Sequence, residues 1–181
     1  IAAANPLVRL VQQANGGKWA ASNTALRYID TDYFIILDAD SVLERDAIIW
    51  IMQPFIEPEI GAVSGIVEVG NSHNWLTSCQ NLEYRVSQNI HRRAYEVFDG
   101  ILVVPGAIGA WRTKAMIAAG LFSGETITED ADLTLAVHRA GFRVVMAENA
   151  RAHTEAPEKV QSFMSQRLRW TLGMLQVSWK H

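Results

Sequence analysis

Short apolar runs and longer stretches with helical spacing alternate along the chain, and this alternation predicts its secondary structure. The apolar runs that predict strands cover residues 33–37, 61–69, 101–104 and 142–147. The stretches that predict helices cover residues 19–29, 44–55, 75–95, 113–119 and 129–140, with a last helix that begins at Pro157. Residues 7–14 fit either a short strand or a helix end. Strands that alternate with helices predict an α/β sandwich with a largely parallel sheet.

The run at residues 33–37 is followed directly by two carboxylates, Asp38 and Asp40, with one small residue between them. A run of this length, rich in aromatic and β-branched residues, predicts a strand buried on both faces. Because open α/β sheets bind ligands at the carboxyl ends of their strands, two acidic groups there suit a divalent cation that holds a diphosphate. An ordinary turn is the alternative, since Asp and Ser are common in turns.

A glycine turn with a lysine precedes the first predicted helix. The Asn15-Gly16-Gly17 sequence favours a turn with positive φ, and Lys18 follows it directly. Such a turn presents a cation and free backbone N–H groups to an anion. The spacing of a phosphate-binding P-loop is absent from the sequence, and a solvated turn lysine is the alternative.

A second acidic cluster opens the helix predicted at residues 129–140. Thr128 is placed to cap this helix, and Glu129 and Asp130 fall in its first turn, where negative charge is favourable. Gly141 is placed to end the helix. The cluster lies about 90 residues after Asp38, so only the fold decides whether the two acidic sites meet.

Gln166, Arg169 and Trp170 share one face of the last predicted helix, because they are spaced three and four residues apart. Arginine binds phosphate oxygens through two parallel hydrogen bonds, and an indole ring offers an apolar face to the C–H groups of a sugar. This face therefore suits a phosphate beside a sugar ring. An amphipathic helix whose arginines extend into solvent is the alternative.

The composition narrows the class of protein. The 181 residues suit a single domain over residues 1–181, and the net charge of −3 gives no basic field that would predict nucleic-acid binding. The single cysteine, Cys79, excludes an internal disulfide framework. No apolar run reaches the roughly 20 residues of a membrane-spanning helix. The first residue is not Met and both ends look cut, so we interpret the chain as a fragment truncated at both ends.

The C-terminal tail is apolar. Trp170 and Trp179 flank a stretch with several aliphatic side chains, and these tryptophans suit anchors at a membrane interface. A helix packed on its own domain is the alternative.

The order of the motifs, more than any one of them, resembles a known family. The ordered set is Asp38-Ala39-Asp40, Thr128-Glu129-Asp130 and Gln166-x-x-Arg169-Trp170. This set resembles the catalytic core of processive family 2 glycosyltransferases, the group that includes bacterial cellulose, hyaluronan and poly-N-acetylglucosamine synthases. The resemblance runs from about residue 15 to the C-terminus, and residues 104–112 resemble the acceptor-side loop of that family.

The resemblance implies a fold and an activity. The implied fold is the three-layer α/β/α GT-A-like fold with a mostly parallel mixed sheet, here without its first strand or strands. The implied activity is an inverting, metal-dependent transfer of a sugar from a nucleotide-diphosphate donor, with UDP expected, to a growing β-linked polysaccharide. The implied cofactor is Mg²⁺ or Mn²⁺. The implied location is the cytoplasmic face of the plasma membrane, reached through flanking helices outside this chain.

The resemblance also implies roles for single residues. Asp40, with Asp38, would bind the metal, and Asp130 would be the general base. The donor would be held by Lys18, Asn23, Asp38, Gln166 and Arg169. The acceptor would be held by Gly106, Ala107, Glu129 and Trp170.

Two positions depart from relatives and two other functions stay open. Ser41 stands where cellulose synthases often have His, which favours an amino sugar or another β-glycan, and Ala107 stands where several relatives have a small polar residue or a thiol. A non-catalytic nucleotide-sugar-binding module would keep the donor site without the chemistry. A metal-dependent phosphohydrolase would use the carboxylates of Asp38 and Asp40, but it would not require Gln166, Arg169 and Trp170 on one helix.

Overall fold

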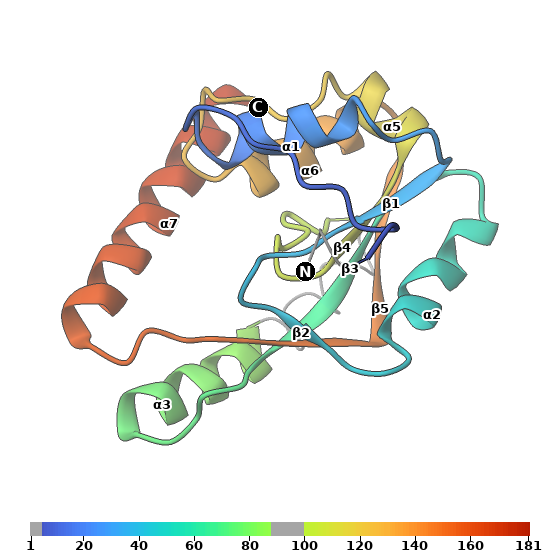
Figure 1. Ribbon diagram of the computed structural model, residues 1–181. Helices are drawn as coiled ribbons and strands as arrows, with labels where there is room; N and C mark the ends of the chain where they lie inside the picture. The colour runs from blue at the N-terminus through green and yellow to red at the C-terminus, as the bar shows by residue number, and fades with distance from the viewer. Residues whose placement is uncertain (1–4, 88–99) are drawn as a thin grey trace.

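A computed structural model describes residues 5–87 and 100–181 (Figure 1). Its helices are α1 (Lys18–Leu26), α2 (Ala47–Met52), α3 (Trp75–Tyr84), α5 (Thr113–Ala118), α6 (Glu129–Arg139) and α7 (Val160–Lys180), with the 3-10 helix η2 (Gln53–Ile56) after α2. Its strands are β1 (Tyr33–Ile36), β2 (Val42–Leu43), β3 (Ile60–Val69), β4 (Gly109–Arg112) and β5 (Arg143–Thr154). None of these helices combines the length and the apolar character that crossing a bilayer requires.

The strands form one mixed sheet in the order β1-β4-β3-β5-β2. β3 and β5 pair in parallel, β4 lies antiparallel between β1 and β3, and β2 pairs antiparallel with β5. β1, β3 and β5 therefore run in the same direction. Their carboxyl ends lie at the same edge of the sheet. The mixed α/β sheet agrees with the prediction, although three of the four described pairings are antiparallel.

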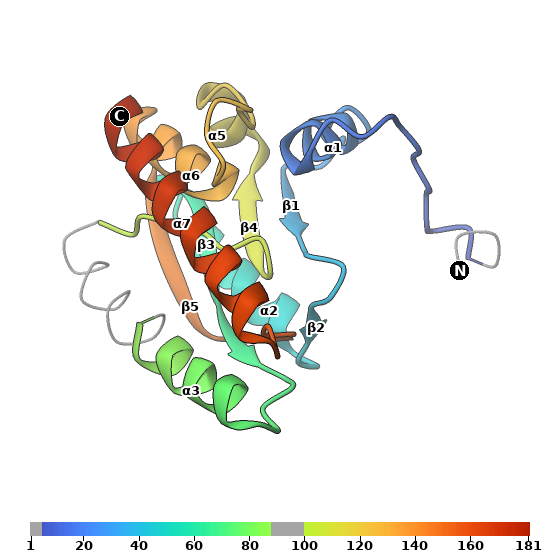
Figure 2. The same cartoon turned by 90° about the vertical axis from the view of Figure 1, so that its left-hand side faces the viewer.

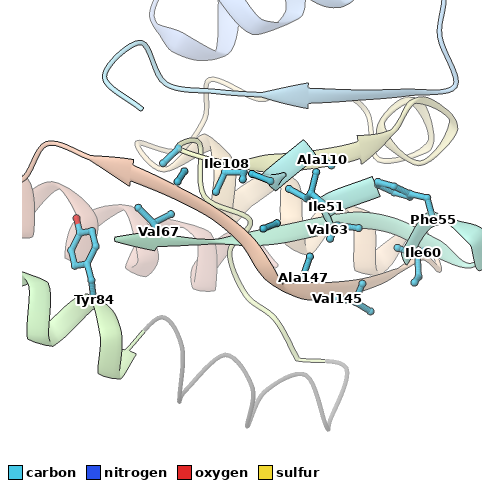
Figure 3. Close-up of a cluster of buried hydrophobic side chains, with 14 of the residues drawn as sticks. Ile51, Phe55, Ile60, Val63, Val67, Tyr84, Ile108, Ala110, Val145 and Ala147 are labelled. Carbon is cyan, nitrogen blue, oxygen red and sulfur yellow. The ribbon is translucent and has the colours of Figure 1, made fainter. Parts of the chain in front are cut away.

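Alternate residues of the central strands enter two different cores. Val63 and Val67 of β3 join a cluster with Ile51 and Phe55 from α2 and η2, part of which is drawn in Figure 3. The intervening residues of β3 join a second cluster with side chains of α5 and α6, such as Met116. The period of two along β3 therefore places helices on both faces of the sheet, which is the three-layer arrangement expected from the resemblance.

Helix α7 crosses one side of the molecule and ends beside α6 (Figures 1 and 2). Only Gly173 and Val177 are buried along its 21 residues. Trp170 is partly buried and packs against the cluster that contains Val63. The helix is thus held mainly by its C-terminal half and by one tryptophan.

Several predicted elements differ in the structure. Residues 7–14 form neither a strand nor a helix, and the strand predicted at 101–104 is a loop in which only Ile101 and Val104 are buried. A strand forms instead at β4, which the sequence did not indicate. The last helix begins at Val160 rather than at Pro157.

Other elements shift less. The helix predicted at residues 44–55 is divided into α2 and η2. β1 was expected to be buried on both faces, but all four of its residues are only partly buried. The helix predicted at 75–95 is described as α3 up to Tyr84, and residues 88–95 lie outside the described part of the chain.

Candidate active site

A small cleft lies where α1, the loop before β4 and α6 meet. It is lined by Lys18, Ile36, Val104, Pro105, Gly106, Trp111, Phe122, Glu129 and Asp130. Lys18 is the first residue of α1, and Gly17 before it has a φ of 87°, the left-handed conformation that glycine adopts without strain. Glu129 and Asp130 open α6. The fold therefore brings together the glycine turn and the second acidic cluster, which are more than 100 residues apart in the sequence.

The ammonium group of Lys18 joins the two acidic sites. Its Nζ atom lies 2.5 Å from Oδ1 of Asp38 and 3.7 Å from Oε1 of Glu129. Burial alone would lower the pKa of Lys18, but the hydrogen bond and the charges of Asp38 and Glu129 outweigh it and raise this pKa above its usual value. Lys18 is thus a positively charged bridge between the end of β1 and the start of α6.

Gly106 is required by this bridge. A Cβ atom at position 106 would overlap Nζ of Lys18 and would lie 3.1 Å from both carboxylate oxygens of Asp38. The absence of a side chain therefore lets the loop backbone lie directly against the ion pair. Gly106, predicted on the acceptor side, therefore faces the carboxylate of Asp38, which was predicted on the donor side.

Asp38 and Asp40 are part of a turn. The backbone N–H of Ser41 donates to the carbonyl oxygen of Asp38 over 3.1 Å, and Asp40 is exposed at the turn. The turn that the sequence left as an alternative is therefore present, and it is also the segment that contacts Lys18. The structure thus shows the turn, and metal binding by Asp38 and Asp40 stays a prediction.

The two aspartates suit a metal that is shared with a ligand. Within residues 5–87 and 100–181, no three His, Cys, Asp or Glu side chains converge on one ion position. Mg²⁺ is commonly held by one or two carboxylates, with water and substrate phosphates filling the other positions. Asp38 and Asp40 fit that pattern and do not fit a closed protein cage for a metal.

Asp130 has an environment suited to proton transfer. Burial and the adjacent charge of Glu129 raise the pKa of Asp130 above its usual value, while the N–H of Ala131 and the charge of Lys18 act in the opposite direction. The N–H of Ala131 donates to Oδ1 over 2.9 Å, and this bond fixes the carboxylate. A carboxylate with a raised pKa is a stronger base than an exposed aspartate.

Thr134 and the loop residue Val104 support the same helix start. The Thr134 hydroxyl donates to the carbonyl oxygen of Asp130 over 2.7 Å and accepts from the N–H of Val104 over 2.9 Å. This link fixes the loop before β4 against α6. It also explains why residues 101–104 form no strand, because the N–H of Val104 is bound to a side chain instead of to a neighbouring strand.

Asn23 and Ala107 lie near the cleft but are occupied by the fold. The amide of Asn23 donates to the carbonyl oxygen of Phe122 over 2.8 Å and accepts from the N–H of Phe122 over 3.1 Å. Asn23 thus ties α1 to the loop that precedes α6. Ala107 is only 7% exposed, and its methyl group packs in the core that contains Val63. The structure therefore gives these side chains supporting positions, and their ligand-binding roles stay predictions.

The predicted residues of α7 lie apart from the cleft lining. Gln166 carries a buried side-chain oxygen that has no hydrogen-bond partner among the described residues, and such an atom is usually satisfied by a ligand or by water. Arg169 is exposed. Trp170 lines a separate groove with Arg167, Thr171, Met174 and Leu175.

Arg167, which the sequence did not single out, is the more enclosed arginine of α7. Its guanidinium lies 4.5 Å from the ring centre of Trp170 and 4.9 Å from that of Phe163. It also donates to the carboxylate of Glu83 on α3 over 2.8 Å. The predicted shared face of Gln166, Arg169 and Trp170 is therefore divided, because Arg169 points to solvent while Trp170 packs inward.

The sequence profile of Glycosyltransferase like family 2 matches residues 1–173. The chain belongs to this family. It is 26% identical over 170 residues to a poly-beta-1,6-N-acetyl-D-glucosamine synthase of Staphylococcus aureus, an alignment that covers 93% of the chain and 41% of that relative. It is 29% identical over 165 residues to an N-acetylglucosaminyltransferase of Azorhizobium caulinodans, covering 86% of the chain and 42% of that relative. The chain thus spans about four-tenths of the length of these family 2 relatives.

Solved structures support the GT-A fold of this family 2 domain. A mannosyltransferase from Pyrobaculum calidifontis, in complex with GDP-Man and Mn²⁺, superposes with a TM-score of 0.72 at 18% identity over 92% of this chain and 44% of the other. Glucosyl-3-phosphoglycerate synthase from Mycobacterium tuberculosis, with Mn²⁺, UDP-glucose and phosphoglyceric acid, gives 0.58 at 13% identity over 92% of this chain and 57% of the other. These similarities confirm the predicted fold.

Proposed function

We propose that the protein to which this family 2 domain belongs transfers a sugar from a nucleotide-diphosphate donor, UDP-linked in the first instance, to a growing β-linked polysaccharide. The observation that carries the proposal is the Lys18 bridge, which joins the donor-side Asp38 to Glu129 at the start of the base-bearing helix α6. One cleft thus holds a phosphate-binding cation and a candidate base. The polysaccharide synthase among the relatives supports a glycan acceptor.

The donor side is assigned to the end of β1 and the start of α1. Lys18 is a cation at a helix N-terminus, where an anionic diphosphate is favoured by both the charge and the backbone N–H groups. UDP is proposed because the neighbouring synthase from Mycobacterium tuberculosis is a complex with UDP-glucose. The Pyrobaculum neighbour is a complex with GDP-Man, so the neighbours share a nucleotide-sugar ligand and differ in its base.

Asp38 and Asp40 are proposed to hold Mg²⁺ or Mn²⁺. When bound, the ion would neutralise negative charge that develops on the departing diphosphate. The pair of carboxylates at the end of β1 fits an ion that shares its coordination with phosphate oxygens. Both structural neighbours described above contain Mn²⁺, which supports a divalent ion in this fold.

Asp130 is proposed as the general base. A sugar hydroxyl is a weak nucleophile, and a carboxylate within hydrogen-bond reach takes its proton as the new bond forms at the anomeric carbon. The raised pKa of Asp130 suits this role, because the carboxylate is then a better proton acceptor. A single displacement of this kind inverts the anomeric configuration and turns an α-linked donor into a β-linked product.

Four further residues complete the proposed site. Gln166 and Arg169 would contact the diphosphate, and the unpaired oxygen of Gln166 leaves a polar atom available for a ligand. Glu129 and Trp170 would contact the acceptor sugar. These side chains lie on two helices, so an occupied site requires α6 and α7 to keep a fixed relation to each other.

The decisive test is UDP release from a panel of UDP-sugars with Mn²⁺ by the full-length protein, together with analysis of the product. Asp130→Asn should abolish transfer and retain UDP binding, and continued turnover would refute Asp130 as the base. Asp40→Ala should lose the Mn²⁺-dependent part of UDP binding, and an unchanged affinity across a Mn²⁺ titration would refute its role as a ligand. A protein that binds UDP-sugars without ever releasing UDP would instead be a binding module.

We further propose that the whole protein acts at the cytoplasmic face of the plasma membrane. Leu172, Leu175 and Trp179 on α7 are exposed apolar side chains, and Trp179 is 93% exposed. Exposed aliphatic residues followed by a tryptophan suit the interface of a bilayer. Flotation of the chain with anionic liposomes tests this surface, and failure to float would favour a helix that only packs on its domain.

A further inference from the structure

The C-terminal half of α7 packs against the segment that leads into α6. Gly173 lies so close to Thr128 that a Cβ atom at 173 would meet the Thr128 Oγ1 atom at 2.5 Å. One turn later, the side-chain oxygen of Gln176 accepts from the backbone N–H of Ile127 over 2.9 Å. Four residues further on, Nζ of Lys180 pairs with the carboxylate of Asp132 on α6 over 2.8 Å. Three contacts at helical spacing thus follow the same face of α7.

Asp132 is the buried residue of α6 in these contacts. Its side chain is 3% exposed, and its carboxylate accepts from Nζ of Lys180 over 2.8 Å and contacts Nε2 of His181 at 2.5 Å. Burial alone would raise the pKa of Asp132, but these two partners outweigh it and lower this pKa. A buried carboxylate of this kind is stable only while its partners remain in place. Lys180 also pairs with Glu125 at 2.8 Å, so it holds both ends of segment 125–132.

Helix α6 needs this external support because it lacks a cap of its own. Thr128 stands at the N-cap position, yet its side chain makes no capping hydrogen bond, and its hydroxyl is buried without a partner among the described residues. Without a bond from the N-cap side chain, the first turn has fewer anchors than a capped helix, although the N–H of Ala131 donates to Oδ1 of Asp130. Asp130 lies in that first turn. The position of its carboxylate therefore depends on what holds residues 127 and 132.

We propose that Gln176 and Lys180 are positioning residues that hold the first turn of α6 against α7 and so direct Asp130 into the cleft. The inference rests on the proposed role of Asp130 as the base. Helix α7 would then have two roles. It carries Gln166, Arg169 and Trp170, and it also fixes the position of the Asp130 carboxylate relative to them. Donor contacts and base are then placed by one rigid pair of helices instead of by two independent elements.

The test compares Gln176→Leu and Lys180→Met in the full-length protein with the wild type. Both variants should lower kcat about 10- to 100-fold, the range expected when a base is displaced by about 1 Å. The KM for the UDP-sugar should change much less, because the donor side at Lys18 and Asp38 is untouched. Gln176→Glu and Lys180→Arg keep an acceptor and a cation at these positions, so they should recover most of the lost kcat.

Two matched controls separate this effect from a general loss of packing. Gln161→Leu changes an exposed glutamine on the same helix, and Lys114→Met changes an exposed lysine on α5. Both should keep the wild-type kcat. Amide hydrogen exchange of residues 125–132 gives a readout without catalysis, and it should become faster in Gln176→Leu and Lys180→Met while exchange in β3 stays slow.

The outcomes distinguish this inference from the proposed function. Wild-type turnover by Asp130→Asn in the same assay would refute Asp130 as the base. It would also refute the inference, because no base would then need to be positioned by α7. An inactive Asp130→Asn beside a Gln176→Leu with wild-type kcat and unchanged exchange at residues 125–132 would overturn the inference alone. If Lys180→Met does not fold, Gln176→Leu decides, because its hydrogen bond lies at the surface and its loss leaves no buried charge unpaired.

Discussion

Replacing Gly173 by alanine tests the close approach of α7 to α6 through the sign of the stability change. A Cβ atom at 173 would overlap the methyl group of Thr128 and would lie 2.5 Å from its Oγ1 atom and 2.9 Å from its Cβ atom. Real Cβ contacts of this kind are not tolerated, so α7 would have to move by about 1 Å to reach ordinary van der Waals distance. Val177 and Trp170 on the same helix would have to move with it.

Two opposing effects set the size of the change. Overpacking a buried contact typically costs about 1–3 kcal/mol. Alanine in place of glycine inside a helix contributes up to about 1 kcal/mol in the opposite direction. We therefore expect Gly173→Ala to lower the free energy of unfolding by about 1–2 kcal/mol. A helix that did not touch Thr128 would be stabilised by the same substitution, so the sign alone decides.

Equilibrium unfolding in urea, followed by circular dichroism, measures this change. Thr128→Ala removes the two nearest atoms, so the double variant should recover stability, with a coupling energy of about 1 kcal/mol or more between the two positions. Gly70→Ala is the control, because its Cβ would meet no atom closer than 3.4 Å. An increase in stability of Gly173→Ala, or additive effects in the double variant, would refute the close contact between α6 and α7.

Three further substitutions test the cleft. Asp130→Asn should abolish transfer and yet raise the stability near pH 7. Because folding raises the pKa of Asp130 above its usual value of 3.8, the protein loses stability as the pH rises from 3.8 through the pKa of the folded state. Thermal melting at a series of pH values measures this loss, which the variant should lack. Asn23→Leu should lower the free energy of unfolding in urea by about 1–3 kcal/mol, because both hydrogen bonds to Phe122 are lost. Asp38→Asn should weaken UDP binding with Mn²⁺ but strengthen it in EDTA, as measured by calorimetry, and weaker binding in both conditions would contradict this charge effect.

Local sequence patterns predicted the elements that carry strong signals. The positive φ of Gly17 and Gly141 follows from glycines at helix boundaries, and the strand β3 follows from its β-branched residues. β4 was missed because Gly109-Ala110-Trp111-Arg112 has no run of branched side chains, and its position is fixed by pairing with β1 and β3. Tertiary pairing here overrides a weak local preference.

The sequence indicated single candidate residues of the site, but it did not predict how these residues contact one another. The sequence named Lys18, Asp38 and Asp130, yet it had no means to show that the ammonium of Lys18 lies between both acidic sites. Gln176 was missed, although it lies three residues after Gly173 and so shares a face of α7 with it. That spacing was a usable signal, because an isolated glycine inside a helix often has a packing reason, and its neighbours on that face then lie close to another element.

The charges of the cleft explain why Asp38→Asn should have opposite effects in the two conditions. Asp38, Glu129 and Asp130 place three carboxyl groups around Lys18, so the described cleft already has an excess of negative charge. A diphosphate brought into a partly buried cleft of this kind is repelled by several kcal/mol at most, on the scale of about 4 kcal/mol for two charges 4 Å apart near a protein surface. Removing the charge of Asp38 lessens that repulsion and leaves Lys18 available to the phosphate. With a divalent ion present, the same carboxylate becomes a ligand, and its loss costs more than the repulsion it relieves.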